Sequence, residues 1–131
     1  MKGKLSKISL IMSILIAIFL LTFIPHKLVD VDPQDVSSIY IFDGRSGHHI
    51  EIKDKDTINY IIENLDSVTF QKGKPTLFRM GAGLRVTIYT NKYFPYKKLI
   101  INTDNNVRYW GFFYGTKVNK IDYKFLQNLL K

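Results

Sequence analysis

The N-terminal part of the chain carries the feature that most limits its fold, a run of 17 residues at positions 8–24 without a charged side chain. As a helix this run is about 26 Å long at 1.5 Å per residue, slightly less than the ~30 Å hydrocarbon core of a bilayer. Counting from Leu5 gives 20 residues, because the Lys7 ammonium can reach the headgroups. Apolar residues occupy every side of this helix, whereas a buried soluble helix shows one apolar stripe. The sequence therefore predicts a transmembrane helix.

The charges on either side of the run predict its orientation. Three lysines precede it, and one lysine and then three aspartates follow it by residue 35. Positive charge is retained on the cytoplasmic side of a membrane helix. The N-terminus is therefore expected in the cytoplasm, and residues 28–131 outside the membrane.

The sequence at the end of the run indicates whether a signal peptidase would remove the helix from the domain. Residues 22–27 read Thr-Phe-Ile-Pro-His-Lys, without the small residues of a signal-peptidase site. An uncleaved single-pass signal-anchor is our first interpretation, and a cleaved signal peptide that releases a secreted domain is the alternative. The chain has no cysteine, which excludes disulfides, thiol catalysis and lipidation of an N-terminal cysteine.

Length and composition predict three segments. Residues 1–27 are the cytoplasmic lysines with the transmembrane helix, residues 28–35 are an acidic linker, and residues 36–131 are one extracytoplasmic domain. The linker sequence DVDPQD lacks the glycine and the distal glutamate of a calcium loop, so no metal is expected there.

Hydrophobic periodicity predicts an α+β domain of order ββαββββα, with two helices on one face of an antiparallel sheet. One helix begins after Asp54 or Asp56 and the other after Asn119 or Asp122, since such residues cap helices. Alternation predicts six strands, at residues 36–42, 48–53, 68–72, 84–91, 97–103 and 107–114.

A tight turn at residues 104–107 would pair the last two strands and assign their faces. In this register Leu99, Ile101 and Thr103 lie opposite Phe112, Trp110 and Arg108 on the core side. The outer face would then be aromatic and basic. Its expected members are Arg85, Tyr89, Lys98, Ile100, Tyr109, Gly111 and Phe113.

The charge is strongly divided along the exported domain. Residues 28–66 carry nine acidic and three basic residues, whereas residues 67–131 carry two acidic and twelve basic. A basic exported surface suits anionic lipid headgroups or phosphate-rich wall polymers, although positive charge also serves solubility. The candidate anionic-ligand surface comprises Arg85, Tyr89, Lys92, Tyr93, Tyr96, Lys97, Lys98, Tyr109 and Phe113.

Two other interpretations apply to this surface. The connection at residues 91–98 mixes lysines with aromatics, and its rings could cover the core while the lysines remain in water. Nucleic acids favour the same residue types, but export places the domain in the wrong compartment for them. We therefore expect no nucleic-acid partner.

The residues offer little for catalysis. His48 and His49 are adjacent on a strand, so their side chains point to opposite faces and cannot share one metal. Ser46 lies near them without a nucleophile elbow or an oxyanion device. We expect no catalytic residue, no metal, no cofactor and no enzymatic activity.

Two segments carry a general resemblance, IEIKDKDTINYIIENL at 50–65 and LRVTIYTN at 84–91 after Met80-Gly81. The chain resembles small exported or membrane-anchored proteins of low-GC Gram-positive bacteria, and this resemblance implies no residue role. The expected function is a membrane-tethered extracytoplasmic binding or accessory domain. The alternative is an immunity or sensory protein that binds a specific peptide or protein at the outer membrane surface.

Overall fold

The computed structural model describes residues 2–77, 83–91 and 93–131. These residues form an α+β fold in which a long N-terminal helix, α1 (Lys2–Leu21), precedes a seven-stranded antiparallel sheet of order β2-β1-β4-β5-β6-β7-β3. The strands are β1 (Ser38–Asp43), β2 (His49–Ile52), β3 (Thr69–Pro75), β4 (Leu84–Tyr89), β5 (Pro95–Thr103), β6 (Asn106–Tyr109) and β7 (Phe112–Val118). The remaining helices are η1 (Pro33–Asp35), α2 (Lys55–Ser67) and α3 (Tyr123–Leu129).

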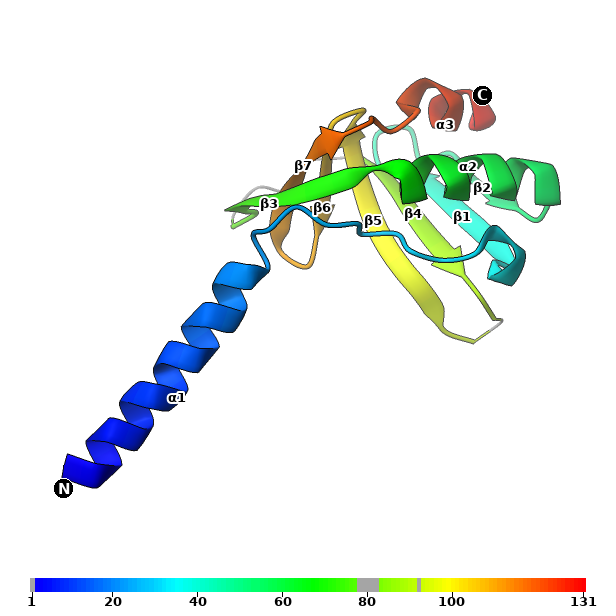
Figure 1. Ribbon diagram of the computed structural model, residues 1–131. Coiled ribbons are helices and arrows are strands. Elements are labelled where there is room, and N and C mark those ends of the chain that lie inside the picture. The colour runs from blue at the N-terminus through cyan, green and yellow to red at the C-terminus, as the bar shows by residue number, and fades with distance from the viewer. Residues whose placement is uncertain (1, 78–82, 92) are drawn as a thin grey trace.

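Helix α1 projects away from the sheet and its other helices (Figure 1). Its residues Gly3–Leu21 are long and apolar enough to cross a membrane, and none of that stretch is buried. By length and composition the helix suits either a membrane anchor or a signal sequence.

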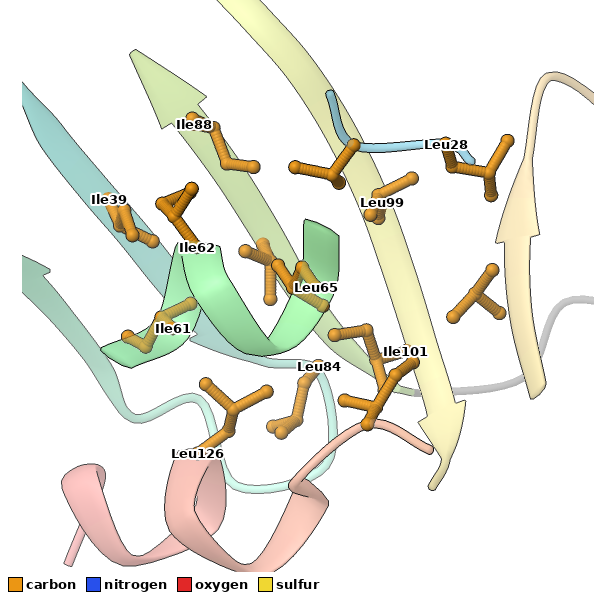
Figure 2. Close-up of a cluster of buried hydrophobic side chains, with 14 of the residues drawn as sticks. Leu28, Ile39, Ile61, Ile62, Leu65, Leu84, Ile88, Leu99, Ile101 and Leu126 are labelled. Carbon is orange, nitrogen blue, oxygen red and sulfur yellow. The ribbon is translucent and has the colours of Figure 1, made fainter. Parts of the chain in front are cut away.

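Helix α2 covers the middle of the sheet, as its periodicity predicts. Asp54 caps it by accepting a hydrogen bond from the Thr57 N–H at 3.1 Å, and the helix buries Ile58, Ile61, Ile62 and Leu65. Figure 2 shows α2 side chains meeting those of β1, β4 and β5, with Leu126 of α3 in the same cluster. The two predicted amphipathic helices thus bury their apolar faces in one core.

The segment predicted as a linker also contributes to this core. Leu28 and Val29 are 2% and 0% exposed, and Figure 2 places Leu28 beside Leu99 of β5. The acidic residues at 30, 32 and 35 favoured the linker interpretation, whereas the two buried residues lie just before them. The chain passes from α1 across the sheet before it enters β1 (Figure 1).

The last predicted strand is two strands, which raises the count from six to seven among the described residues. Trp110 and Gly111 adopt φ angles of 49° and 77°, and Tyr109 pairs directly with Phe112 across them. Two successive residues with positive φ make the two-residue turn that matches the twist of paired strands. The prediction missed this turn because the aromatic run on either side reads as continuous strand.

The predicted pairing of the strands around residues 104–107 is wrong by an odd number of residues. Ile101 pairs with Val107, and Ile100 pairs with Arg108. An odd shift exchanges the two faces of a strand, so Arg108 lies on the outer side, and Trp110 is 84% exposed in its turn. Tyr109, which was predicted on the outer face, instead packs against the core on the same side of β6 as Val107. Phe112 pairs with Tyr109 and remains on the core side, since the extra turn reverses the alternation once more.

Candidate functional site

The face of the sheet opposite α2 carries a basic row across three strands. Arg85 of β4 pairs with Ile100 of β5, which pairs with Arg108 of β6. Paired residues point to the same side of a sheet, and neighbouring strands are about 4.8 Å apart. The two arginines therefore flank Ile100 with their backbones roughly 10 Å apart. Lys98 lies two residues before Ile100 and so shares this face.

These residues line a shallow hollow of about 420 Å³. Ile100 lies between the two arginines in its lining, and Trp110 comes from the β6–β7 turn. The complete lining is Thr76, Arg85, Lys98, Ile100, Arg108, Tyr109, Trp110 and Gly111. Three cationic side chains thus surround an apolar patch with one exposed indole, and the described lining includes no carboxylate.

The two acidic residues of the basic half of the chain lie in a different place. Asp104 and Asp122 line a separate hollow at α3. Arg85 instead lies over the Phe42 ring, 5.8 Å from its centroid, which leaves its guanidinium edge available to a ligand. The hollow therefore gathers charges of one sign.

A second hollow on the same face, of about 600 Å³, contains Tyr89. Tyr40, Glu51 and Lys53 line it too, and the last two form an ion pair at 3.8 Å. Its charges are therefore of both signs, unlike those of the first hollow. Tyr89 therefore lies in a different hollow from Arg85 and Lys98, with which it was predicted to form one surface.

Two of the predicted surface residues, Lys97 and Tyr96, bond to the N-terminal segment instead. The Lys97 ammonium donates to the Leu28 carbonyl and lies 5.3 Å from the centroid of the Tyr109 ring. The Tyr96 hydroxyl donates to the Asp30 carbonyl at 3.0 Å. Burial lowers the pKa of Lys97, while Asp30 partly opposes this change. These residues secure the segment that follows α1.

The other described residues of the predicted surface, Tyr93 and Phe113, do not line the hollow. Tyr93 is 81% exposed in the connection between β4 and β5, Phe113 pairs with Arg108 on the outer side, and Lys92 lies outside the described residues. The structure therefore brings Arg85 and Lys98 together, with Tyr109 also in the lining of the hollow, and adds Arg108 and Trp110, which the sequence pattern places in the core. Gly111 was the available signal, since a glycine within a strand pattern indicates a break.

The residues considered for catalysis lie in the exposed connection between β1 and β2 and at the start of β2. His48 and His49 are exposed, and the Ser46 hydroxyl donates to Asp43 at 3.1 Å. The backbone N–H of Arg45 also donates to Asp43 at 2.8 Å, and this bond is the main reason that the pKa of Asp43 is lowered. In residues 2–77, 83–91 and 93–131 no three His, Asp or Glu side chains converge as a metal site requires.

Comparison of the chain with protein-family models, with curated proteins and with solved structures finds no match.

Proposed function

We propose that this protein is a non-enzymatic, membrane-anchored domain that binds an anionic ligand on the outer side of the membrane. Helix α1 would be the anchor, with the N-terminus in the cytoplasm because of its lysines. The hollow of Arg85, Lys98 and Arg108 would be the binding site. The convergence of these three cations around Ile100 is the observation that carries the proposal.

The chemistry of the hollow favours a phosphate-bearing ligand with an apolar part. Guanidinium groups bind phosphate oxygens in pairs, and Lys98 would add a mobile point charge. Ile100 and Trp110 offer an apolar surface for a glycerol or sugar unit between the phosphates. Anionic lipid headgroups and phosphate-rich wall polymers both have this composition.

The test uses the full chain in nanodiscs of zwitterionic lipid, titrated by calorimetry with a glycerol-phosphate oligomer. Replacing Arg85, Lys98 and Arg108 together by glutamine should weaken binding by roughly tenfold or more, since charge-assisted bonds at an exposed site contribute about 0.5–1 kcal/mol each. Nanodiscs that contain an anionic phospholipid form the second arm, in which competition with the oligomer would identify a headgroup as ligand.

A matched variant separates this site from net charge. Lys117, Lys120 and Lys124 are exposed and do not line the hollow, so their replacement by glutamine removes the same charge elsewhere. Binding should then fall less than about threefold and keep its salt dependence. Equal losses in both variants, or binding insensitive to salt, would contradict the proposed site.

Anchoring is tested independently by cell fractionation and protease treatment. A C-terminal tag should remain with membranes after alkaline carbonate extraction and should be digested from outside intact protoplasts. Recovery of a shortened, soluble chain would indicate a cleaved signal peptide instead.

A further inference from the structure

The end of α1 is attached to the sheet by a defined set of contacts. The Lys72 ammonium of β3 lies 4.1 Å from the centroid of the Phe112 ring and 4.9 Å and 5.2 Å from those of Phe19 and Phe23. It also donates to the Thr22 hydroxyl at 3.1 Å. A cation at this place is favoured by the partial negative charge at a helix C-terminus. Lys72 therefore joins the helix to the β3–β7 edge of the sheet.

Backbone hydrogen bonds strengthen this joint just beyond the helix. The His26 N–H donates to the Phe70 carbonyl, and the Phe70 N–H donates to the His26 carbonyl, both at 2.8 Å. The Gln71 amide donates to the Phe23 carbonyl at 3.4 Å. Contacts on both sides of residues 24 and 25 restrict rotation of the domain about α1. One edge of the domain is consequently held on the side from which α1 extends.

That edge consists of the end of β3 and the β6–β7 turn. Figure 1 shows both beside the point where α1 leaves, whereas α3 lies at the opposite end of the domain. The Thr76 N–H donates to the Gly111 carbonyl at 2.8 Å, which ties the chain after β3 to the turn. Leu77 and Trp110, the neighbours of these two residues, therefore belong to one surface.

This surface exposes large apolar side chains, which folding by itself tends to bury. Trp110 is 84% exposed and Leu77 is 72% exposed, and both follow strands rather than pack on them. Trp110 also has a φ of 49°, an angle that asparagine or glycine adopts at lower cost. Lys74 is exposed close by, at the end of β3. Tryptophan and leucine with a neighbouring lysine are typical of the bilayer interface.

We infer that Trp110 and Leu77, with Lys74, form a membrane-facing edge that rests in the headgroup layer of the bilayer spanned by α1. The inference rests on the proposed anchoring and adds the orientation of the domain. The hollow with Arg85, Lys98 and Arg108 shares Trp110 with this edge, so it opens next to the headgroups.

The chain contains a single tryptophan, which makes the inference directly measurable. The full chain is reconstituted into zwitterionic vesicles, with and without lipids brominated near the top of the acyl chains. Trp110 emission should shift to shorter wavelength than in a water-exposed indole and fall by about half with brominated lipid, as expected at the interface. Zwitterionic lipid keeps this result independent of anion binding in the hollow.

A matched reporter position lies at the other end of the same strand. Val118 ends β7, which begins at Phe112 beside Trp110, and is 55% exposed. Six residues of strand place it roughly 20 Å farther along. In the double variant Trp110→Phe with Val118→Trp, brominated lipid should leave the emission unchanged within about a tenth. Circular dichroism confirms that the variant is folded.

The outcomes separate the two proposals. Vesicle flotation and carbonate extraction report insertion of α1, and a chain that fails them contradicts the anchoring itself. A chain that inserts but whose Trp110 is quenched by aqueous iodide, and not by brominated lipid, overturns the membrane-facing edge alone. Equal quenching by brominated lipid of the native chain and of the double variant would likewise overturn it, because no single edge would then face the bilayer.

Discussion

The turn at Trp110-Gly111 should be more stable with asparagine in the first position. Trp110 has a φ of 49°, and a side chain with a bulky β-carbon substituent costs about 1–2 kcal/mol in this region. Asparagine is the preferred residue before glycine in this kind of turn. Trp110→Asn should therefore recover about 1 kcal/mol of that cost.

One contact opposes the gain. The Trp110 ring lies 6.4 Å from the Tyr109 ring in an edge-on arrangement, and aromatic pairs contribute about 0.5–1.5 kcal/mol. Because Trp110 is 84% exposed, the lower end of that range applies. The net effect is a stabilisation of about 0.5 kcal/mol, or a Tm higher by about 2–4 °C for a domain of this size.

Thermal unfolding of the full chain in detergent, followed by far-ultraviolet circular dichroism, measures this difference. Trp110→Phe is the matched variant, since it keeps the backbone cost and should change Tm by less than about 2 °C. Gly111→Ala tests the second turn residue, where φ is 77° and an added Cβ meets no atom within 4 Å. Backbone conformation alone should then lower stability by about 1 kcal/mol. If Trp110→Asn is no more stable than Trp110→Phe, the reasoning about the turn is refuted.

Three further substitutions test the core, a close contact and a helix cap. Leu65→Ala should lower the free energy of unfolding in urea by about 2–5 kcal/mol, because Leu65 is 0% exposed; a loss below about 1 kcal/mol would contradict its place in the core. Gly83→Ala should cost about 1–3 kcal/mol, since an added Cβ would lie 2.9 Å from the Ile101 carbonyl oxygen; unchanged stability would mean that the strands separate easily. The pKa of Asp54 is lowered, chiefly by the hydrogen bond from the Thr57 hydroxyl. The stability that this carboxylate adds to the fold is therefore present above the unfolded pKa of about 3.9 and is lost as the pH falls through the lower folded value. In acid titrations followed by circular dichroism, Asp54→Ala should be less stable than the native chain at neutral pH, and this difference should disappear in acid; a constant difference would refute the assignment.

The elements with strong periodicity were predictable because each uses one local pattern. Ile58, Ile61, Ile62 and Leu65 recur at helical spacing and are all buried. Along β4, Leu84, Val86 and Ile88 are buried, and Arg85 between them faces outward, as the alternation predicts. These positions depend only on the geometry of one element and on its need to bury one face.

The candidate site was predicted in part, and its errors have one cause. Arg85 and Lys98 lie on strands whose alternation is clear, and the structure places both at the hollow. Arg108 and Trp110 were assigned to the core because their direction depends on the exact number of residues in each turn. A turn shorter or longer by one residue reverses every later side chain, and propensity does not fix turn length to that precision.

By itself, the sequence determined the apolar helix at the N-terminus, the α+β class and most of the core, since these follow from the spacing of apolar residues along the chain. Only the tertiary structure decided which residues of the predicted basic surface contact the N-terminal segment and which line the hollow. Lys97 and Tyr96 hold the segment after α1, while Arg85, Lys98 and Arg108 gather on the opposite face. It also decided that Lys72 meets the end of α1, a contact across 50 residues of sequence. Such contacts depend on strand order and register, which are set by the packing of the whole sheet and have no signature within a single segment.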